Sequence, residues 1–201
     1  MDEGAGTWVK DYSRYGNHGT MTNMDASTDW ITMTGAGTTN FYNPYALDFD
    51  GDNDVVSVND SYLWTFPANL TVSAWVTLDV VSGARVMVGH NYVAPNRGWI
   101  LYFNSDNTLH WGYSTNGTDS NDTGRSWSPS TGTWYNVIAK RQGNNVQLYV
   151  DGTAVGATIS MTSVPYNSTG NLYIGDEGST VSEWDGKIDD VRLYNRALSN
   201  S

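Results

Sequence analysis

The sequence contains no cysteine. Disulfide bonds, thiolate metal sites and cysteine nucleophiles are therefore excluded. Positive charge is also scarce, because 10 Lys and Arg residues oppose 21 Asp and Glu residues, for a formal net charge of -11. Nucleic-acid binding depends largely on Lys and Arg side chains that neutralise phosphates. This balance argues against nucleic acid as a partner and favours the binding of cations.

Long apolar runs are missing as well. No stretch approaches the roughly 20 apolar residues of a membrane-spanning helix, so we expect no membrane insertion. The chain opens with Met-Asp-Glu-Gly and lacks the basic start and apolar run of a signal peptide. We therefore expect either a module excised from a larger protein or a protein that reaches a surface in another way, for example inside a virion.

The sequence is rich in short segments that alternate apolar and polar residues. In residues 70–78, alternation places Leu70, Val72, Ala74, Val76 and Leu78 on one face of a strand. Further strands of this kind are predicted at 99–103, 108–113, 134–141, 146–150, 171–175 and 187–194. No segment of ten or more residues has the 3.6-residue period of a helix.

Residue pairs that accept positive φ angles lie between these segments. They are Asp50-Gly51, Asn116-Gly117, Gly143-Asn144 and Asp151-Gly152. Many short strands joined by such turns predict an all-β fold, a two-sheet antiparallel β-sandwich or jelly roll. We expect residues 1–201 to form a single domain, in which the less regular residues 1–45 wrap around the sandwich.

Five motifs in this order resemble the laminin-G-like branch of the concanavalin A-like lectin/glucanase superfamily. They are DEGAGT with DYSRYGNHGT (2–7 and 11–20), ALDFDGDNDVV (46–56), LTVSAWV (70–76), LYVDG (148–152) and GKIDDVRLYNRALS (186–199). Each motif is weak alone, but five in the right order across nearly the whole chain are specific. The resemblance implies a concanavalin A-like jelly roll with a lectin-like function.

The resemblance also implies a structural Ca²⁺ that joins the early loop to the last strand. On this interpretation Asp11 and Asp189 supply carboxylates, and Asn17 and Gly19 supply mainly backbone oxygens. Ca²⁺ takes about six to eight oxygen ligands at loose geometry, which suits a loop rich in Gly and Asn. The alternative is that Asp11 caps a turn and that Asp189 faces solvent or pairs with Arg192.

The aspartates at positions 48, 50, 52 and 54 do not form an EF-hand. Asn53 stands where that loop needs Gly, and Asn59 stands where it needs Glu. The pair Asp50-Gly51 is better interpreted as a hairpin corner, and a second cation there is an open alternative.

No catalytic motif is present in the sequence. The glucanases of the superfamily carry a Glu-x-Asp-x-x-Glu pattern that places two carboxyl groups about the scissile bond. The segment most similar to this pattern is Glu183-Trp184-Asp185, but Ile188 occupies the position of the second Glu. We therefore predict no catalytic residues and no enzymatic activity.

The nine Trp and 13 Tyr residues exceed what one core needs. Aromatic planes bind the apolar faces of sugar rings, while amides and carboxylates bind the hydroxyls. Several aromatic and polar side chains face away from the aliphatic rows of their strands and would form one face if those strands were neighbours. The candidate ligand-binding residues are Trp75, Tyr102, His110, Gln147, Tyr149 and Tyr173, with Asn91, Tyr92 and Arg97 in a loop at the rim. The alternatives are a site at the loop tips, or Tyr and Trp that serve only as good strand formers.

Together these observations predict a non-catalytic lectin-like module stabilised by structural Ca²⁺. Its partner would be a glycan or a surface polysaccharide, in carbohydrate recognition or adhesion at an extracellular, cell-surface or virion-associated location. The alternative is an architectural domain of a virion, fibre or surface filament that contacts a neighbouring structural protein. A glucanase-like enzyme is disfavoured because paired carboxylates are missing.

Overall fold

The structure, a computed structural model, describes residues 1, 3–32, 44–64, 68–161, 163–178 and 182–199. Its strands are β1 (Trp8–Val9), β2 (Gly19–Thr22), β3 (Trp30–Thr32), β4 (Tyr45–Asp50), β5 (Val55–Val58), β6 (Asn69–Val76), β7 (Arg85–His90), β8 (Trp99–Asn104), β9 (Thr108–Tyr113), β10 (Asn121–Ser126), β11 (Tyr135–Gln142), β12 (Asn145–Val150), β13 (Thr153–Ser160), β14 (Leu172–Ile174) and β15 (Asp185–Tyr194). A 3₁₀ helix, η1 (Tyr62–Trp64), lies between β5 and β6. Within the described ranges, no helix has the length and apolar character needed to cross a membrane.

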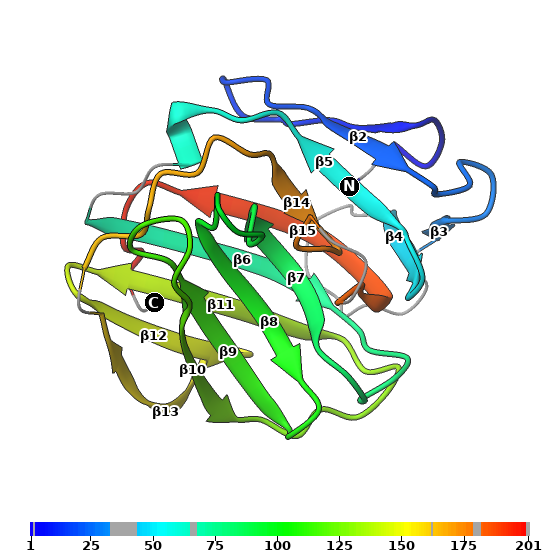
Figure 1. The fold of residues 1–201 in the computed structure, drawn as a ribbon. Helices are drawn as coiled ribbons and strands as arrows, with labels where there is room; N and C mark the ends of the chain where they lie inside the picture. The colour runs from blue at the N-terminus through cyan, green and yellow to red at the C-terminus, as the bar shows by residue number, and fades with distance from the viewer. Residues whose placement is uncertain (2, 33–43, 65–67, 162, 179–181, 200–201) are drawn as a thin grey trace.

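The strands form two antiparallel sheets that face each other (Figure 1). The eight-stranded sheet has the order β1-β2-β5-β14-β7-β8-β9-β10, and the seven-stranded sheet has the order β13-β12-β11-β6-β15-β4-β3. Strands from late in the chain lie between early ones, since β14 separates β5 from β7 and β15 separates β4 from β6. The architecture confirms the predicted all-β sandwich.

The core lies between the two sheets and contains the apolar rows predicted from alternation. On β6 and just beyond it, Leu70, Val72, Ala74, Val76 and Leu78 are at most 1 % exposed. The opposite sheet contributes Trp99, Leu101, Phe103, Leu109 and Trp111 to the same core. Burying one large apolar side chain contributes about 1.5–3 kcal/mol, so these rows determine which face of each strand points inward.

Tight turns connect the central strands of the seven-stranded sheet. Gly143-Asn144 joins β11 to β12, and Asp151-Gly152 joins β12 to β13. Asp151 and Gly152 have φ angles of 49° and 75°, which a two-residue hairpin turn of this kind requires. The pair Asp50-Gly51 begins the connection from β4 to β5, but these strands belong to different sheets, so the predicted hairpin at this position is wrong. Asn116-Gly117 belongs instead to a longer loop between β9 and β10.

The N-terminal segment does not simply wrap around the sandwich. Its strands β1 and β2 extend one edge of the eight-stranded sheet, and β3 forms an edge of the seven-stranded sheet. The prediction of a wrapping segment is therefore corrected: the described part of residues 1–45 adds hydrogen-bonded strands to both layers. Alternation could not predict β1 and β2, because strands of two to four residues show no clear period.

Candidate functional site

The predicted ligand-binding side chains lie on the outer faces of two different sheets. Tyr102 on β8, His110 on β9 and Tyr173 on β14 belong to the eight-stranded sheet. Trp75 on β6, and Gln147 and Tyr149 on β12, belong to the seven-stranded sheet. The prediction of a single aromatic face is therefore wrong. Alternation reports which side chains point outward, but it does not report the sheet that a strand joins.

Two of the residues on the seven-stranded sheet, Gln147 and Tyr149, have local partners, whereas Trp75 is 37% exposed. The Gln147 amide nitrogen donates to the backbone oxygens of Val155 at 3.4 Å and Gly156 at 3.2 Å, and thereby supports the irregular pairing of β12 with β13. The ammonium of Lys140 lies 5.1 Å from the centre of the Tyr149 ring. These contacts stabilise the sheet and leave Tyr149 partly covered.

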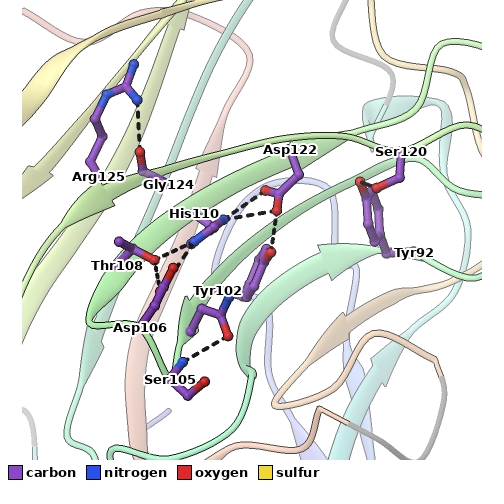
Figure 2. Close-up of polar contacts among 11 residues, drawn as sticks. Tyr92, Tyr102, Ser105, Asp106, Thr108, His110, Ser120, Asp122, Gly124 and Arg125 are labelled. Carbon is purple, nitrogen blue, oxygen red and sulfur yellow. Dashed lines mark hydrogen bonds and ion pairs between the residues drawn. The ribbon is translucent and has the colours of Figure 1, made fainter.

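On the eight-stranded sheet, two side chains converge on one carboxylate. Tyr102 and His110 are direct cross-strand neighbours, with ring centroids 4.7 Å apart. The Tyr102 hydroxyl donates to Asp122 Oδ2 at 2.6 Å, and His110 Nδ1 hydrogen-bonds with the same oxygen at 3.0 Å. Figure 2 shows both rings directed toward Asp122. We call Tyr92, Tyr102, Asp106, Thr108, His110 and Asp122 the outer-face cluster.

Two glycines make room for the rings of this cluster. Gly124 pairs with His110, and a Cβ at Gly124 would lie only 2.4 Å from His110 Nε2. Gly112 pairs with Asp122, and a Cβ at Gly112 would lie 2.9 Å from the Tyr92 hydroxyl oxygen. The imidazole and the phenol can therefore lie close against the sheet, where larger residues would lift them away.

The second edge of the imidazole faces another acidic side chain. His110 Nε2 contacts the Thr108 hydroxyl, which also hydrogen-bonds with Asp106, and Asp106 Oδ1 lies 3.9 Å from His110 Nε2. The side chain of His110 is 11 % exposed, whereas those of Asp106 and Asp122 are 60 % and 32 % exposed. The two carboxylates are therefore more accessible than the imidazole to solvent and to a ligand.

Both phenols of the cluster form hydrogen bonds with side chains of the protein. Burial raises the pKa of Tyr102, and the hydrogen bond to Asp122 together with that carboxylate's charge raises it further. Burial also raises the pKa of Tyr92, whose hydroxyl lies 2.9 Å from the Ser120 hydroxyl. Both phenols remain protonated at neutral pH. The face thus combines aromatic surface with carboxylate acceptors.

The predicted rim loop lies beside the cluster and is held by Arg97. Its Nε donates to the backbone oxygen of Tyr92 at 3.2 Å, and one terminal nitrogen donates to the backbone oxygen of Thr118 at 2.8 Å. The guanidinium carbon lies 5.6 Å from the Tyr92 ring centre. Arg97 therefore joins the β7–β8 and β9–β10 loops and positions Tyr92.

The two remaining predicted residues, Asn91 and Tyr173, pack against a third loop. A Cβ on Gly178 would lie 2.9 Å from the Tyr173 ring and 3.1 Å from Asn91 Oδ1. Strand β7 separates Tyr173 from the strand that holds Tyr102. Asn91 and Tyr173 thus help to place the surrounding loops, while Tyr92, Tyr102 and His110 come together.

Sequence reasoning missed Asp122, which connects the cluster. Residues 121–126 are almost entirely polar, and β10 is an edge strand that pairs with β9 alone in its sheet. An edge strand with both faces partly in water needs no apolar alternation. The available signal was Gly124 within a polar segment, because glycine in a strand marks a close approach by another group.

The predicted calcium ligands in the early loop form a capped turn. Asp11 accepts hydrogen bonds from the backbone nitrogens of Ser13 at 2.7 Å and Asn17 at 2.8 Å. Partial burial raises the pKa of Asp11, but these hydrogen bonds and that from the Ser13 hydroxyl outweigh it and lower the pKa overall. Gly19 begins β2, where a Cβ would lie 2.5 Å from Val56 Cγ1. The loop therefore holds Asp11 ionised in a defined geometry.

Asp189 lies on β15, is 0 % exposed, and has its Oδ1 atom 3.3 Å from the Met1 nitrogen. It does not face solvent, and Arg192 pairs instead with Asp190 at 2.7 Å. Among the residues that the structure describes, no group of three or more His, Asp or Glu side chains could hold a metal ion. A site made from two carboxylates and backbone oxygens remains a prediction.

The acidic segment before β15 is bound to the fold. Glu183 is 7 % exposed, and its backbone oxygen accepts a hydrogen bond from Arg85 at 2.9 Å. The same guanidinium lies 4.0 Å from Asp185 Oδ2. Arg85 thus connects β7 with the start of β15 and gives these residues a structural role.

Comparison with known families and structures relates the chain to one superfamily. A laminin G family model, described as the concanavalin A-like lectin/glucanases superfamily, matches residues 50–201. No curated protein sequence matches the chain.

Several solved structures share the fold. The binding domain of botulinum neurotoxin serotype G has a TM-score of 0.67 and 15% identity over 95% of this chain and 46% of its own. Trypanosoma rangeli sialidase in complex with the inhibitor DANA has a TM-score of 0.62 and 17% identity over 96% of this chain and 31% of its own. The CBM40 of Ruminococcus gnavus IT-sialidase, bound to α2,3-sialyllactose, has a TM-score of 0.55 and 16% identity over 67% of this chain and 79% of its own. The chain spans about half the length of the toxin binding domain, and these identities show the fold alone.

Proposed function

The chain belongs to the concanavalin A-like lectin/glucanases superfamily, and from this premise we propose that it is a non-catalytic carbohydrate-binding module. The main support is the convergence of Tyr102 and His110 on Asp122 at the outer face of the eight-stranded sheet. Aromatic rings bind the apolar faces of sugars, and a partly exposed carboxylate accepts hydrogen bonds from sugar hydroxyls.

The contacts of the carboxylates favour binding over catalysis. A glycosidase places two carboxyl groups on either side of the scissile bond, one as an acid and the other as a base or nucleophile. Here Asp106 and Asp122 lie at opposite edges of the same imidazole and hydrogen-bond with side chains of the protein. Two of the similar structures are also described as a binding domain and as a CBM40 bound to sialyllactose, which supports a binding role for this fold.

A glycan ligand favours an extracellular, cell-surface or virion-associated location, which we propose on this ground. The ligand would be a cellular glycan or a surface polysaccharide. The net charge of -11 remains an argument against nucleic acid as the partner.

We further propose that the early loop binds a structural Ca²⁺ together with the last strand. Asp11 is held by amide hydrogen bonds that lower its pKa, so its carboxylate is charged at neutral pH. Each carboxylate oxygen has a second lone pair that can contact a cation. Asp189 would add the second carboxylate, while Asn17 and Gly19 would add backbone oxygens. When bound, the ion would supply fold stability and no chemistry of its own.

A second candidate function is an architectural domain that contacts protein. The observation that favours it is a group of exposed aromatic side chains on and near the β1–β2 loop: Trp8, Tyr12, Tyr15 and Tyr62 are 47%, 64%, 45% and 79% exposed. Aromatic residues are enriched at protein–protein contacts. A surface of this kind would suit attachment to a neighbouring structural protein.

The proposal is tested on a glycan array with variants of both sheets. We expect Tyr102→Ala and Asp122→Ala to abolish binding, because they remove the ring and the acceptor of the outer-face cluster. Tyr149→Ala is the matched control, since it removes a partly exposed tyrosine from the opposite sheet. Circular dichroism and thermal melting confirm that each variant is folded.

Two results would overturn this assignment. Loss of binding in Tyr149→Ala but not in Tyr102→Ala would move the site to the seven-stranded sheet. A wild-type protein that binds no glycan, while Trp8→Ala and Tyr62→Ala weaken its binding to a structural protein, would favour the architectural function.

A further inference from the structure

We infer that the outer-face cluster selects neutral saccharides over sugar acids, and that Asp122 is the residue that sets this selectivity. The inference rests on the proposed function and specifies the class of sugar. It follows from the charges that line the face and from the partners of the nearby cations.

Carboxylates dominate the charge around Tyr102. Asp106 and Asp122 are 60 % and 32 % exposed and lie on either side of His110. Both of these charges act on the Tyr102 hydroxyl. On the Tyr92 hydroxyl, the charge of Asp122 acts together with the opposite charge of Arg97 and the charge of Glu177. A ligand that stacks on Tyr102 therefore enters a negative potential.

The nearby guanidinium groups are directed toward backbone oxygens. Arg97 donates to the backbone oxygens of Tyr92 and Thr118. Arg125, which lies on β10 beyond Gly124, donates through Nε to the backbone oxygen of Ala157 at 2.6 Å. Both arginines hold loops or strands together, and these hydrogen bonds occupy donors that could otherwise receive the carboxylate of a sugar acid.

Hydrogen-bond chemistry leads to the same class of ligand. The groups that solvent reaches at Asp106 and Asp122 are acceptors, which require donors from the ligand. A neutral sugar supplies hydroxyl donors and carries no negative charge. A sialylated glycan carries a carboxylate. One protein charge of the same sign about 4 Å from that carboxylate lowers the affinity about fivefold in water, and by more where water is excluded.

The experiment measures affinity for matched pairs of immobilised glycans, each a neutral oligosaccharide and its α2,3-sialylated form. We expect wild-type protein to bind the neutral member at least about fivefold more tightly. Asp122→Asn keeps a side chain of the same shape but removes the charge, and it should bring the affinity ratio toward one. Asp52→Asn is the matched control, because it removes one exposed charge from the loop between β4 and β5, and it should leave the ratio unchanged.

Salt provides a measurement that does not depend on the variant. Screening weakens repulsion between exposed charges, so the wild-type ratio of affinities for the neutral and sialylated glycans should approach one as ionic strength rises. Sialylated members that bind as tightly as neutral ones in wild-type protein would overturn the selectivity and leave glycan binding intact. If neither member of any pair binds, the proposed function fails and the selectivity fails with it.

Discussion

Tyr102 and Asp122 are joined by a hydrogen bond of 2.6 Å that passes over a whole strand. Tyr102 lies on β8, Asp122 lies on β10, and β9 runs between them. Neighbouring strands are about 4.8 Å apart, so the phenol spans roughly two strand spacings to reach the carboxylate. His110 on β9 fills the space below this contact and hydrogen-bonds with the same oxygen. The candidate site therefore depends on the order of three strands.

Gly124→Ala should displace His110 and destabilise the sheet face. The added Cβ would lie 2.4 Å from the imidazole, which Asp122 and Thr108 hold in place. We expect the free energy of unfolding in urea to fall by about 1–3 kcal/mol, as for other overpacked sites. In a His110→Ala background the same substitution should cost almost nothing, because its steric partner is gone. Equal costs in both backgrounds would refute this steric account.

Arg125→Ala should loosen the edges of both sheets. Its guanidinium donates to Ala157 at 2.6 Å and Thr158 at 3.3 Å, and so joins β10 of one sheet to β13 of the other. We expect a loss of about 1–2 kcal/mol in the free energy of unfolding, together with weaker glycan binding, since β10 also holds Asp122. Arg192→Ala, which breaks an exposed pair with Asp190, should cost less than about 1 kcal/mol. Equal losses from the two variants would contradict a clamp at Arg125.

Asp54 should make the protein less stable as the pH rises toward neutrality. Burial, with the charge of Asp50 and other nearby aspartates, raises the pKa of Asp54 to about 6. Between about pH 4 and 6 the native state keeps a proton that the unfolded state has lost, so the free energy of unfolding falls as the pH increases through this window. Asp54→Asn cannot ionise, and at pH 7 it should exceed wild type in stability by about 1–3 kcal/mol.

The measurement for Asp54 is urea unfolding at a series of pH values. The difference between Asp54→Asn and wild type should appear above about pH 4 and level off above about pH 6. Asp52→Asn, in the same loop but exposed, should keep the wild-type slope. A constant difference between wild type and Asp54→Asn across this range would show that the buried carboxyl does not titrate as described.

Chelation should lower the melting temperature if the early loop binds Ca²⁺. A ligand at 100 times its Kd, bound only by the native state, adds about 2.7 kcal/mol to the free energy of unfolding. For a domain of this size that corresponds to a shift of roughly 5–10 °C. Asp11→Asn should abolish the shift. Asp25→Asn should retain it, because Asp25 likewise accepts the Ser27 amide at 2.8 Å and has no part in the proposed site. An unchanged melt of metal-depleted wild type would count against the ion.

Alternation predicted the central strands well and the edge strands poorly. In β6, every second residue from Leu70 to Val76 is buried, and this row follows directly from the apolar pattern. Strand β10 and most of β13 are polar or exposed, because an edge strand contacts one neighbour and much water. Their sequences therefore contain little periodic signal.

The sequence predicted which side chains of the candidate site point outward, but not which of them lie together. The outward direction of Tyr102 and His110 follows from Leu101, Phe103 and Leu109, which point inward on the same strands. Trp75 and Tyr149 also point outward, yet they lie on the other layer. The direction of a side chain is a local property of its strand, whereas the choice of sheet depends on contacts between distant segments.

The sequence by itself determined the all-β class, the inward rows of most central strands and the two hairpin turns at the ends of β12, because burial of every second side chain and positive φ at a turn are local requirements. Only the tertiary structure decided that β14 lies between β5 and β7, that β10 lies beside β9, and that Asp122 meets Tyr102. Strand order is set by hydrogen bonds and packing between segments far apart in the chain. The alternation of residues within one strand contains no information about these contacts.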